Sequence, residues 1–146
     1  MTLGAGRVIF HDLIRVQRAL DDGSLARSPE MRAAIATAKR AGGHMHLLGL
    51  VSDGGVHSSL SHLEGLVDLL QAGGVRPIVH AFTDGRDTPP ESALRWLPGL
   101  EARLGACGGC IASVSGRYWA MDRDKRWDRV RRAYDAIVSR RGDMPA

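Results

Sequence analysis

Three segments of this chain combine arginine, aspartate and histidine with glycine, and these residue types are suited to binding small anions. They read Ser-Asp-Gly-Gly-Val-His at residues 52–57, Asp-Gly-Arg-Asp-Thr-Pro-Pro at residues 84–90, and Ser-Gly-Arg-Tyr-Trp-Ala-Met-Asp-Arg-Asp at residues 115–124. An arginine fork binds phosphate or carboxylate through two hydrogen bonds, and a nearby carboxylate accepts a hydroxyl or its proton. The three segments together predict a site for a phosphorylated hydroxy acid.

Ordinary structural roles are open alternatives for the same side chains. Asp-Gly pairs are frequent turn formers, and turn chemistry favours a loop-shaping role for Asp53 and Asp84. His57 has the alternative of capping the helix that follows it. The other charged residues have the alternative of forming surface ion pairs, which contribute little: Arg86 with Asp87, and Arg117 and Arg123 with Asp122 and Asp124. Convergence of the three segments is what favours a binding site.

The elements that precede these segments explain why they should converge. Residues 44–51, 77–83 and 110–115 are short apolar runs that predict buried strands, and each runs directly into one of the three segments. Strands that alternate with helices predict a mainly parallel sheet flanked by helices, which is an α/β layered domain. Because ligands bind beyond the carboxyl ends of parallel strands, all three segments are expected on one rim of the sheet.

In the stretches outside the strands, apolar residues recur at the spacing typical of helices. A stripe through Ile9 to Leu20 predicts a first helix, and Ser28 followed by Pro29 predicts the start of a second that ends near residue 42. Further helices are predicted after each binding segment, over about residues 60–70, 91–104 and 127–137. The second of them carries an apolar side made of Leu94, Leu97, Leu100 and Leu104. Pro98 weakens the second of these predictions. We therefore expect a partial substrate-binding domain at residues 1–138 and a tail at residues 139–146.

Composition narrows the function classes. The chain has 146 residues and a formal charge of +4, carried almost entirely by arginine, and it shows no motif for nucleic-acid binding. Its apolar runs are far shorter than the roughly 20 residues that cross a bilayer, and its start shows no signal pattern, so a cytoplasmic location is the default. No nucleic acid or membrane partner is expected.

The remaining histidines and the two cysteines do not suggest a metal or redox site. His44, His46 and His80 fall within predicted strands and are expected to be packed, and His62 falls within a predicted helix. Cys107 and Cys110 come just before a strand, whereas a redox pair usually follows one, so a tight turn is the favoured interpretation. No spacing typical of a metal site connects these residues, and no metal ligand is predicted.

The three binding segments, in this order and spacing, closely resemble those of the cofactor-independent phosphoglycerate mutases. Residues 4–7 (Gly-Ala-Gly-Arg) and 126–130 (Arg-Trp-Asp-Arg-Val) extend the resemblance, which runs to about Val138. It implies that the chain is part of the α/β phosphotransferase domain inserted into that enzyme, and an incomplete version of it. It also implies an isomerase that interconverts 3-phosphoglycerate and 2-phosphoglycerate in glycolysis.

The same resemblance assigns roles to individual residues. It implies that substrate is bound by His57, Arg86, Asp87, Arg117 and Arg123. It makes Asp87 the candidate to exchange protons with the glycerate hydroxyls, while the arginines hold carboxylate and phosphate charge.

The family's serine nucleophile and its two divalent metals, usually manganese, belong to a separate phosphatase-like domain. The resemblance implies that this chain contains neither, and that it is inactive alone because phosphoryl transfer needs both. The missing domain is then a possible partner of the chain. Two other hypotheses stay open: a non-catalytic phosphoglycerate-binding or regulatory module, and catalysis completed by that domain on another chain.

Overall fold

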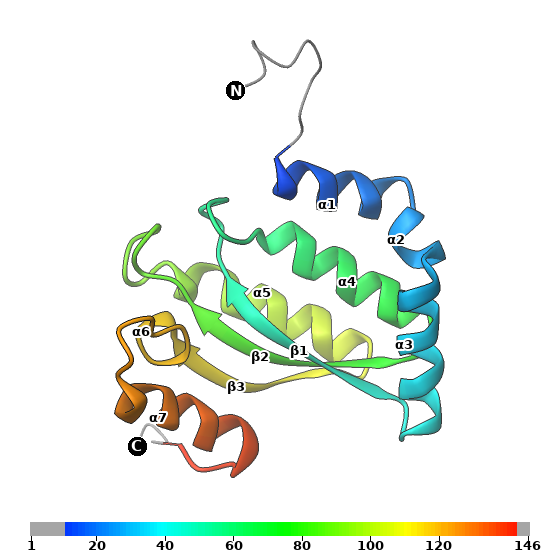
Figure 1. The fold of residues 1–146 in the computed structure, drawn as a ribbon. Coiled ribbons are helices and arrows are strands. Elements are labelled where there is room, and N and C mark those ends of the chain that lie inside the picture. Colours follow the sequence, from blue (N-terminus) through cyan, green and yellow to red (C-terminus); the bar gives the residue numbers. More distant parts are fainter. Residues whose placement is uncertain (1–10, 143–146) are drawn as a thin grey trace, which may run out of the picture.

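The structure is a computed structural model, and it describes residues 11–142. Short helices and parallel strands alternate along the chain, as Figure 1 shows. In chain order the elements are α1 (Asp12–Asp21), α2 (Ser24–Arg27), α3 (Pro29–Arg40), β1 (His44–Val51), α4 (Leu60–Ala72), β2 (Arg76–Thr83), α5 (Ala93–Ala106), β3 (Cys110–Gly116), α6 (Arg117–Ala120) and α7 (Trp127–Val138).

The three predicted strands form one parallel sheet in the order β1-β2-β3. Val51, at the end of β1, is paired with Thr83 of β2, and Thr83 is paired in turn with Gly116 of β3. The carboxyl ends of the strands are therefore level with one another. The prediction of an α/β layered domain with a parallel sheet is confirmed, and it follows from a strand-helix alternation that is visible in the sequence.

The main core lies between the sheet and the two helices that connect its strands. Its buried residues are contributed by β1, β2, α4 and α5: Val51, Val67, Val79, Ala81, Trp96, Leu100 and Leu104. Leu94, which the helical spacing suggested for this face, is 70% exposed, and Trp96 is buried instead. The helix α5 continues through Pro98, whose position is exposed, so its missing N–H is not buried in the core.

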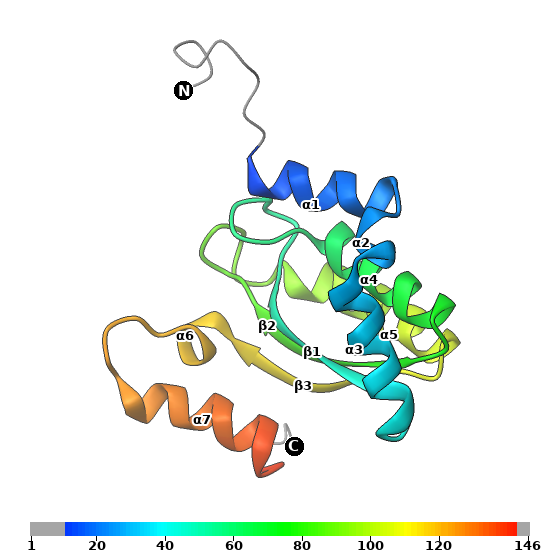
Figure 2. The ribbon, with the colours of Figure 1, turned by 45° about the vertical axis from the view of Figure 1, so that its right-hand side comes forward.

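The opposite side of the sheet is only partly covered. The helix α7 lies on that side, next to β3, whereas α4 and α5 lie on the core side (Figures 1 and 2). His80 is buried on the less covered side and links His46 to Ser113 through ring-nitrogen contacts of 2.8 Å each. Burial, followed by the neighbouring His46, lowers the pKa of His80 below its ordinary value.

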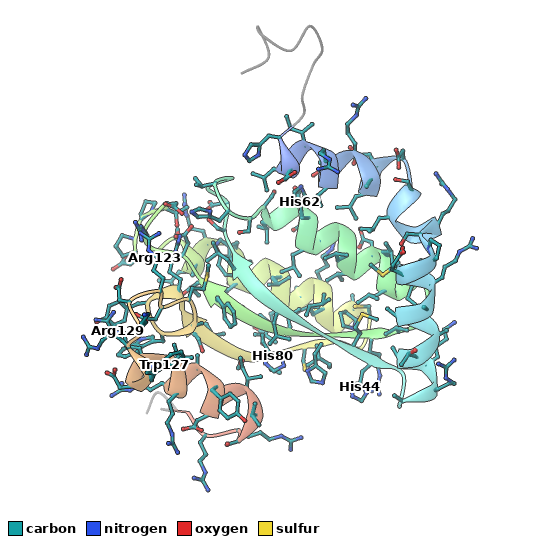
Figure 3. The ribbon with its side chains drawn as sticks, viewed as in Figure 1. His44, His62, His80, Arg123, Trp127 and Arg129 are labelled. Carbon is teal, nitrogen blue, oxygen red and sulfur yellow. The ribbon has the colours of Figure 1, made fainter. Side chains whose placement is uncertain are left out.

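The expectation that all three strand histidines are packed was wrong for two of them. His44 and His46 are exposed, because the alternation along β1 places both on the side that the core helices do not cover, as Figure 3 shows for His44. The alternation of side chains along a strand places them together with Leu48, which is 55% exposed. His62 lies in α4, as expected.

Two short helices were not anticipated. α2 joins the first two predicted helices, and α6 begins inside the segment 115–124 that was expected to be loop. The cysteines are free, and they flank the turn between α5 and β3 as predicted. A Cβ at Gly109 in this turn would lie 2.3 Å from the carbonyl oxygen of Pro77, so only glycine fits there.

The proposed domain division lies at the edge of what the structure describes. The helix α7 ends at Val138, and residues 139–142 contain no helix or strand. Ile9, the Gly-Ala-Gly-Arg stretch at residues 4–7 and the last four residues lie outside the described residues, so the division at residue 138 stays a prediction. No helix within residues 11–142 has the length and apolar character needed to cross a membrane.

Candidate functional site

The three segments that follow the strands surround one cavity of about 500 Å³ at the rim of the sheet. Its volume lies within the usual range for small-molecule sites. The cavity is lined by one histidine, four arginines, three aspartates and four other residues: His57, Arg86, Arg117, Arg123, Arg129, Asp84, Asp122, Asp124, Gly85, Gly116, Tyr118 and Met121. The predicted convergence of the three segments is therefore observed.

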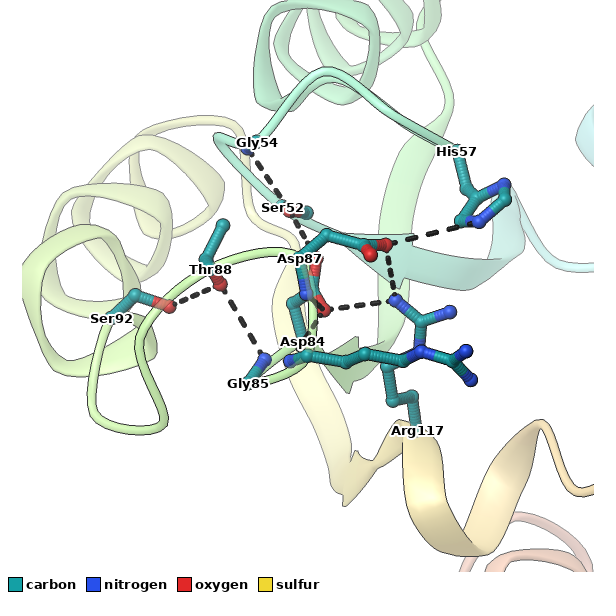
Figure 4. A network of polar contacts seen from close by, with 10 residues as sticks. Ser52, Gly54, His57, Asp84, Gly85, Asp87, Thr88, Ser92 and Arg117 are labelled. Atoms are coloured by element: carbon teal, nitrogen blue, oxygen red, sulfur yellow. Dashed lines mark hydrogen bonds and ion pairs between the residues drawn. The ribbon is translucent and has the colours of Figure 1, made fainter.

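Asp84 connects all three segments (Figure 4). Its side chain is 2% exposed, and one oxygen accepts a hydrogen bond from the hydroxyl of Ser52 at 2.6 Å. The other oxygen accepts from the backbone N–H groups of Arg86 and Asp87, both at 3.0 Å, and from Arg117 at 2.9 Å. Burial alone raises the pKa of Asp84, but these four hydrogen bonds outweigh burial and hold it well below its ordinary value.

Arg117 lies between two carboxylates. The same terminal nitrogen that contacts Asp84 also donates to Asp87 at 2.6 Å, and the Arg117 side chain is only 14% exposed. These contacts, with Asp87 and then Asp84, raise the pKa of Arg117 above its ordinary value. His57 approaches the same Asp87 oxygen, with 3.8 Å between the ring nitrogen and the carboxylate (Figure 4). Asp87 is thereby held between a histidine and an arginine.

The third segment is organised by a second buried aspartate. The side chain of Asp122 is 2% exposed and accepts hydrogen bonds from the backbone N–H groups of Asp124 and Arg126 at 3.1 and 2.8 Å. Arg129, in the first turn of α7, donates to the other oxygen of Asp122 at 3.1 Å and stacks over the ring of Tyr118 at 4.0 Å. The loop that carries Arg123 is therefore attached to the start of α7.

Arg86 and Arg123 are the cations available to a ligand. Both line the cavity, and within residues 11–142 neither guanidinium forms a hydrogen bond or an ion pair with the protein. Arg123 is exposed, on the side of the molecule where the three segments lie (Figure 3). Because a guanidinium offers up to five donors, these two side chains can hold an anion without giving up an internal contact.

Close backbone packing holds the first two segments together. A Cβ at Gly54 would lie 2.9 Å from the Thr88 methyl group and 3.3 Å from the carbonyl oxygen of Asp87, so this glycine lets the first loop rest on the second. Thr88 in turn contacts the hydroxyl of Ser92 at 2.8 Å, which anchors the second loop at the start of α5. The rim is built from tightly packed loops.

The structure decides among the roles considered for the individual residues. His57, Arg86, Arg117 and Arg123 line the cavity, and Asp87 lies beside it through its contacts with Arg117 and His57. Arg117 pairs with Asp84 and Asp87, and Asp122 pairs with Arg129, so the surface pairings considered for these residues were wrong. The alternative that His57 caps α4 was also wrong, because the N-cap is Ser59.

Asp53 and Asp84 differ from each other. Asp53 forms an ion pair with Arg95 at 3.2 Å and does not line the cavity. Asp84 does shape its loop, as turn chemistry favours, but it also contacts the cavity and Arg117.

Sequence reasoning missed three residues of the site: Ser52, Tyr118 and Arg129. All three belong to the quoted segments, so their positions were visible in the sequence, whereas their contacts were not.

The described residues do not fit a metal centre. Among residues 11–142, no group of three or more His, Cys, Asp and Glu side chains is arranged to hold a metal ion. The cavity lining also contains no serine. No chemical step is assigned to a metal at this rim.

Comparisons with known proteins agree on one family. A family model described as the BPG-independent PGAM N-terminus matches residues 16–146. The 2,3-bisphosphoglycerate-independent phosphoglycerate mutase of Myxococcus xanthus is 53% identical over 142 residues, covering 96% of this chain and 28% of the relative. The enzyme of the same name from Symbiobacterium thermophilum is 52% identical over 140 residues, covering 94% of this chain and 27% of the relative.

A solved structure shows the same fold. A crystal structure of Leishmania mexicana phosphoglycerate mutase at low cobalt concentration superposes with a TM-score of 0.84 and 33% identity. The match covers 93% of this chain and 26% of that one. The chain thus spans little more than a quarter of the length of the proteins that it matches.

Proposed function

Because this chain belongs to the family of 2,3-bisphosphoglycerate-independent phosphoglycerate mutases, we propose that its rim cavity binds 3-phosphoglycerate and 2-phosphoglycerate for their interconversion. The observation that carries the proposal is the pair of arginines, Arg86 and Arg123, which line the cavity and whose guanidinium groups have no hydrogen-bond or ion-pair partner among residues 11–142. A phosphoglycerate carries two anionic groups, and each of these two guanidinium groups can bind one of them.

The roles of the other residues follow from their contacts. Arg117 is already engaged by two carboxylates through one nitrogen, so we assign it to holding Asp87 in place while its remaining donors face a ligand anion. Asp87 is the candidate to accept a proton from a glycerate hydroxyl and to return it, with His57 on its other side. This assignment of His57, Arg86, Asp87, Arg117 and Arg123 to substrate is a proposal.

The proposed contribution of the rim is binding and orientation. The serine nucleophile and the two metal ions expected of the family's full-length enzyme have no counterpart among the residues that line the cavity. In this proposal the rim holds the glycerate, and residues outside the rim provide the phosphoryl transfer. The cytoplasmic and glycolytic setting is part of the same proposal.

Phosphorus NMR of 3-phosphoglycerate in metal-free buffer tests binding. We expect a shift that saturates with a dissociation constant on the order of millimolar or tighter. The Arg86→Ala, Arg123→Ala double variant should bind at least about tenfold more weakly, because two charge-assisted contacts are lost. The matched control is Arg32→Ala, Arg40→Ala, which removes the same charge from α3.

Three results would change the proposal. Equal binding by both double variants would show that the phosphate responds to net charge and that the cavity is not the site. No binding by the unmodified chain at millimolar concentration would reject the proposal. Formation of 2-phosphoglycerate by the purified chain, followed after addition and later chelation of manganese, would show that the chain provides phosphoryl transfer as well.

A further inference from the structure

Asp84 is unusual among the acidic residues of the rim because its partners come from all three loops. Ser52 belongs to the first loop, Arg86 and Asp87 to the second, and Arg117 follows the third strand. The two oxygens of the carboxylate accept four hydrogen bonds between them, so Asp84 has little capacity left for a ligand. Its side chain is 2% exposed, which is consistent with an internal role.

The contacts of Asp84 determine where two proposed ligand-binding groups lie. Arg117 is separated from Asp84 by 33 positions in the sequence, and its guanidinium is fixed by the same nitrogen that donates to Asp87. The N–H of Asp87 donates to Asp84 as well, so both ends of the Arg117–Asp87 pair are attached to one carboxylate (Figure 4). Movement of Asp84 would therefore move both groups together.

The first loop is attached to the same point. The Ser52 hydroxyl donates to Asp84 and accepts from the N–H of Gly54, and Ser52 is itself buried. Gly54 then packs against Thr88 of the second loop. His57 is carried by the loop that begins at Ser52, so its approach to Asp87 also depends on this attachment.

We propose that Asp84 is a positioning residue, which sets the spacing of the three rim loops so that Arg117, Asp87 and His57 face one ligand. The binding part of this inference rests on the proposed function. A purely electrostatic role predicts the opposite effect on an anionic ligand, because a buried negative charge beside the cavity repels it. The two roles can therefore be separated by removing the charge and keeping the shape.

The test is Asp84→Asn in the full chain, with Asp53→Asn as the matched control. Asp53 carries the same charge, lies in the first loop and pairs with Arg95 outside the cavity. We expect Asp84→Asn to weaken 3-phosphoglycerate binding by roughly tenfold or more, because misplaced groups lose productive geometry. Asp53→Asn should bind as the unmodified chain does or slightly more tightly. Tighter or unchanged binding by Asp84→Asn overturns the proposal.

A ligand-free measurement keeps this inference separate from the proposed function. In proton–nitrogen NMR spectra, the side-chain N–H signals of Arg117 should be distinct and slow to exchange in the unmodified chain, because its guanidinium is fixed. They should move toward those of the exposed arginines in Asp84→Asn and stay in place in Asp53→Asn. If the Arg117 signals are unchanged in Asp84→Asn, Asp84 does not position that side chain, whether or not phosphoglycerate binds.

Ser52→Ala provides a milder variant in case Asp84→Asn does not fold. It removes only the attachment of the first loop, and we expect binding about threefold weaker, which corresponds to one hydrogen bond. It should also shift the signals of His57 while leaving those of Arg123, whose loop is organised by Asp122. Unchanged binding together with unchanged His57 signals would show that the Ser52 contact has no positioning role and would overturn the three-loop form of the proposal.

Discussion

The second and third rim loops, residues 84–90 and 115–124, are each organised by one buried aspartate, but the two aspartates have different roles. Each is built on an aspartate whose side chain is 2% exposed, and each aspartate accepts two backbone N–H groups and one arginine. The partners of Asp122 all lie within the next seven residues, whereas those of Asp84 lie up to 33 positions away. One aspartate therefore closes a local loop, and the other joins three loops.

Burial and hydrogen bonding alone do not distinguish an aspartate with a local role from one with a long-range role. Arg129 is held by Asp122 and also by the ring of Tyr118, so it keeps one partner if the other is lost. Within residues 11–142, Arg117 forms ion pairs with Asp84 and Asp87, so it also keeps one partner if Asp84 is lost, and its side chain is about as buried as that of Arg129. Loss of Asp84 should have the larger effect for a different reason: it also detaches Ser52 of the first loop, whereas the partners of Asp122 given above are all local.

The largest expected effect is on the free energy of unfolding. Asp84→Ala should lower it by about 3–5 kcal/mol, because it leaves the Ser52 hydroxyl and two backbone N–H groups without their acceptor and removes one of the two carboxylates that Arg117 contacts. Asp122→Ala should lower it by about 2 kcal/mol, since Arg129 is partly compensated by Tyr118. Urea unfolding followed by circular dichroism measures both. Equal losses would remove the distinction between the two loops.

An effect of intermediate size is expected on the free energy of unfolding at acidic pH. The folded pKa of Asp84 is lowered from its ordinary value of 3.8, so this carboxylate contributes stability that is fully present above about pH 4. That contribution is lost as the pH falls below 3.8 toward the folded pKa, with a slope of up to about 1.4 kcal/mol per pH unit for one proton. Unfolding measured from pH 5 to about pH 2 should show this slope in the unmodified chain and a shallower one in Asp84→Asn. Identical slopes would contradict the assignment.

The smallest effect is expected from an exposed ion pair. Arg103 donates to both oxygens of Asp68 at 2.8 and 2.6 Å, distances as short as those at Asp84, but the side chains are 40% and 57% exposed. Arg103→Ala should therefore lower the free energy of unfolding by no more than about 1 kcal/mol. A loss as large as that of Asp84→Ala would show that short distance, and not burial, determines the contribution of these aspartates.

Much of the fold could be predicted because its signals are local. The runs at residues 44–51, 77–83 and 110–115 became strands within one residue of the expected ends, because apolar stretches bounded by glycine and polar segments are short-range patterns. The errors concern which side chains are buried, because that depends on how the elements pack against one another. Trp96 replaced Leu94 in the core of α5, and His46 was left exposed, because the sequence does not show which side of an element will be covered.

The candidate site was predicted as a set of residues, but its contacts were not. The strand-helix alternation in the sequence is enough to place the three segments after parallel strands, and strand geometry then requires them to share one rim. The pairing of Arg117 with Asp84 and Asp87 became visible in the folded chain, as did the lack of a partner within residues 11–142 for the guanidinium groups of Arg86 and Arg123. The physical reason is that an arginine pairs with whichever carboxylate the folded loops bring within hydrogen-bond distance, and adjacency in the chain does not fix that choice.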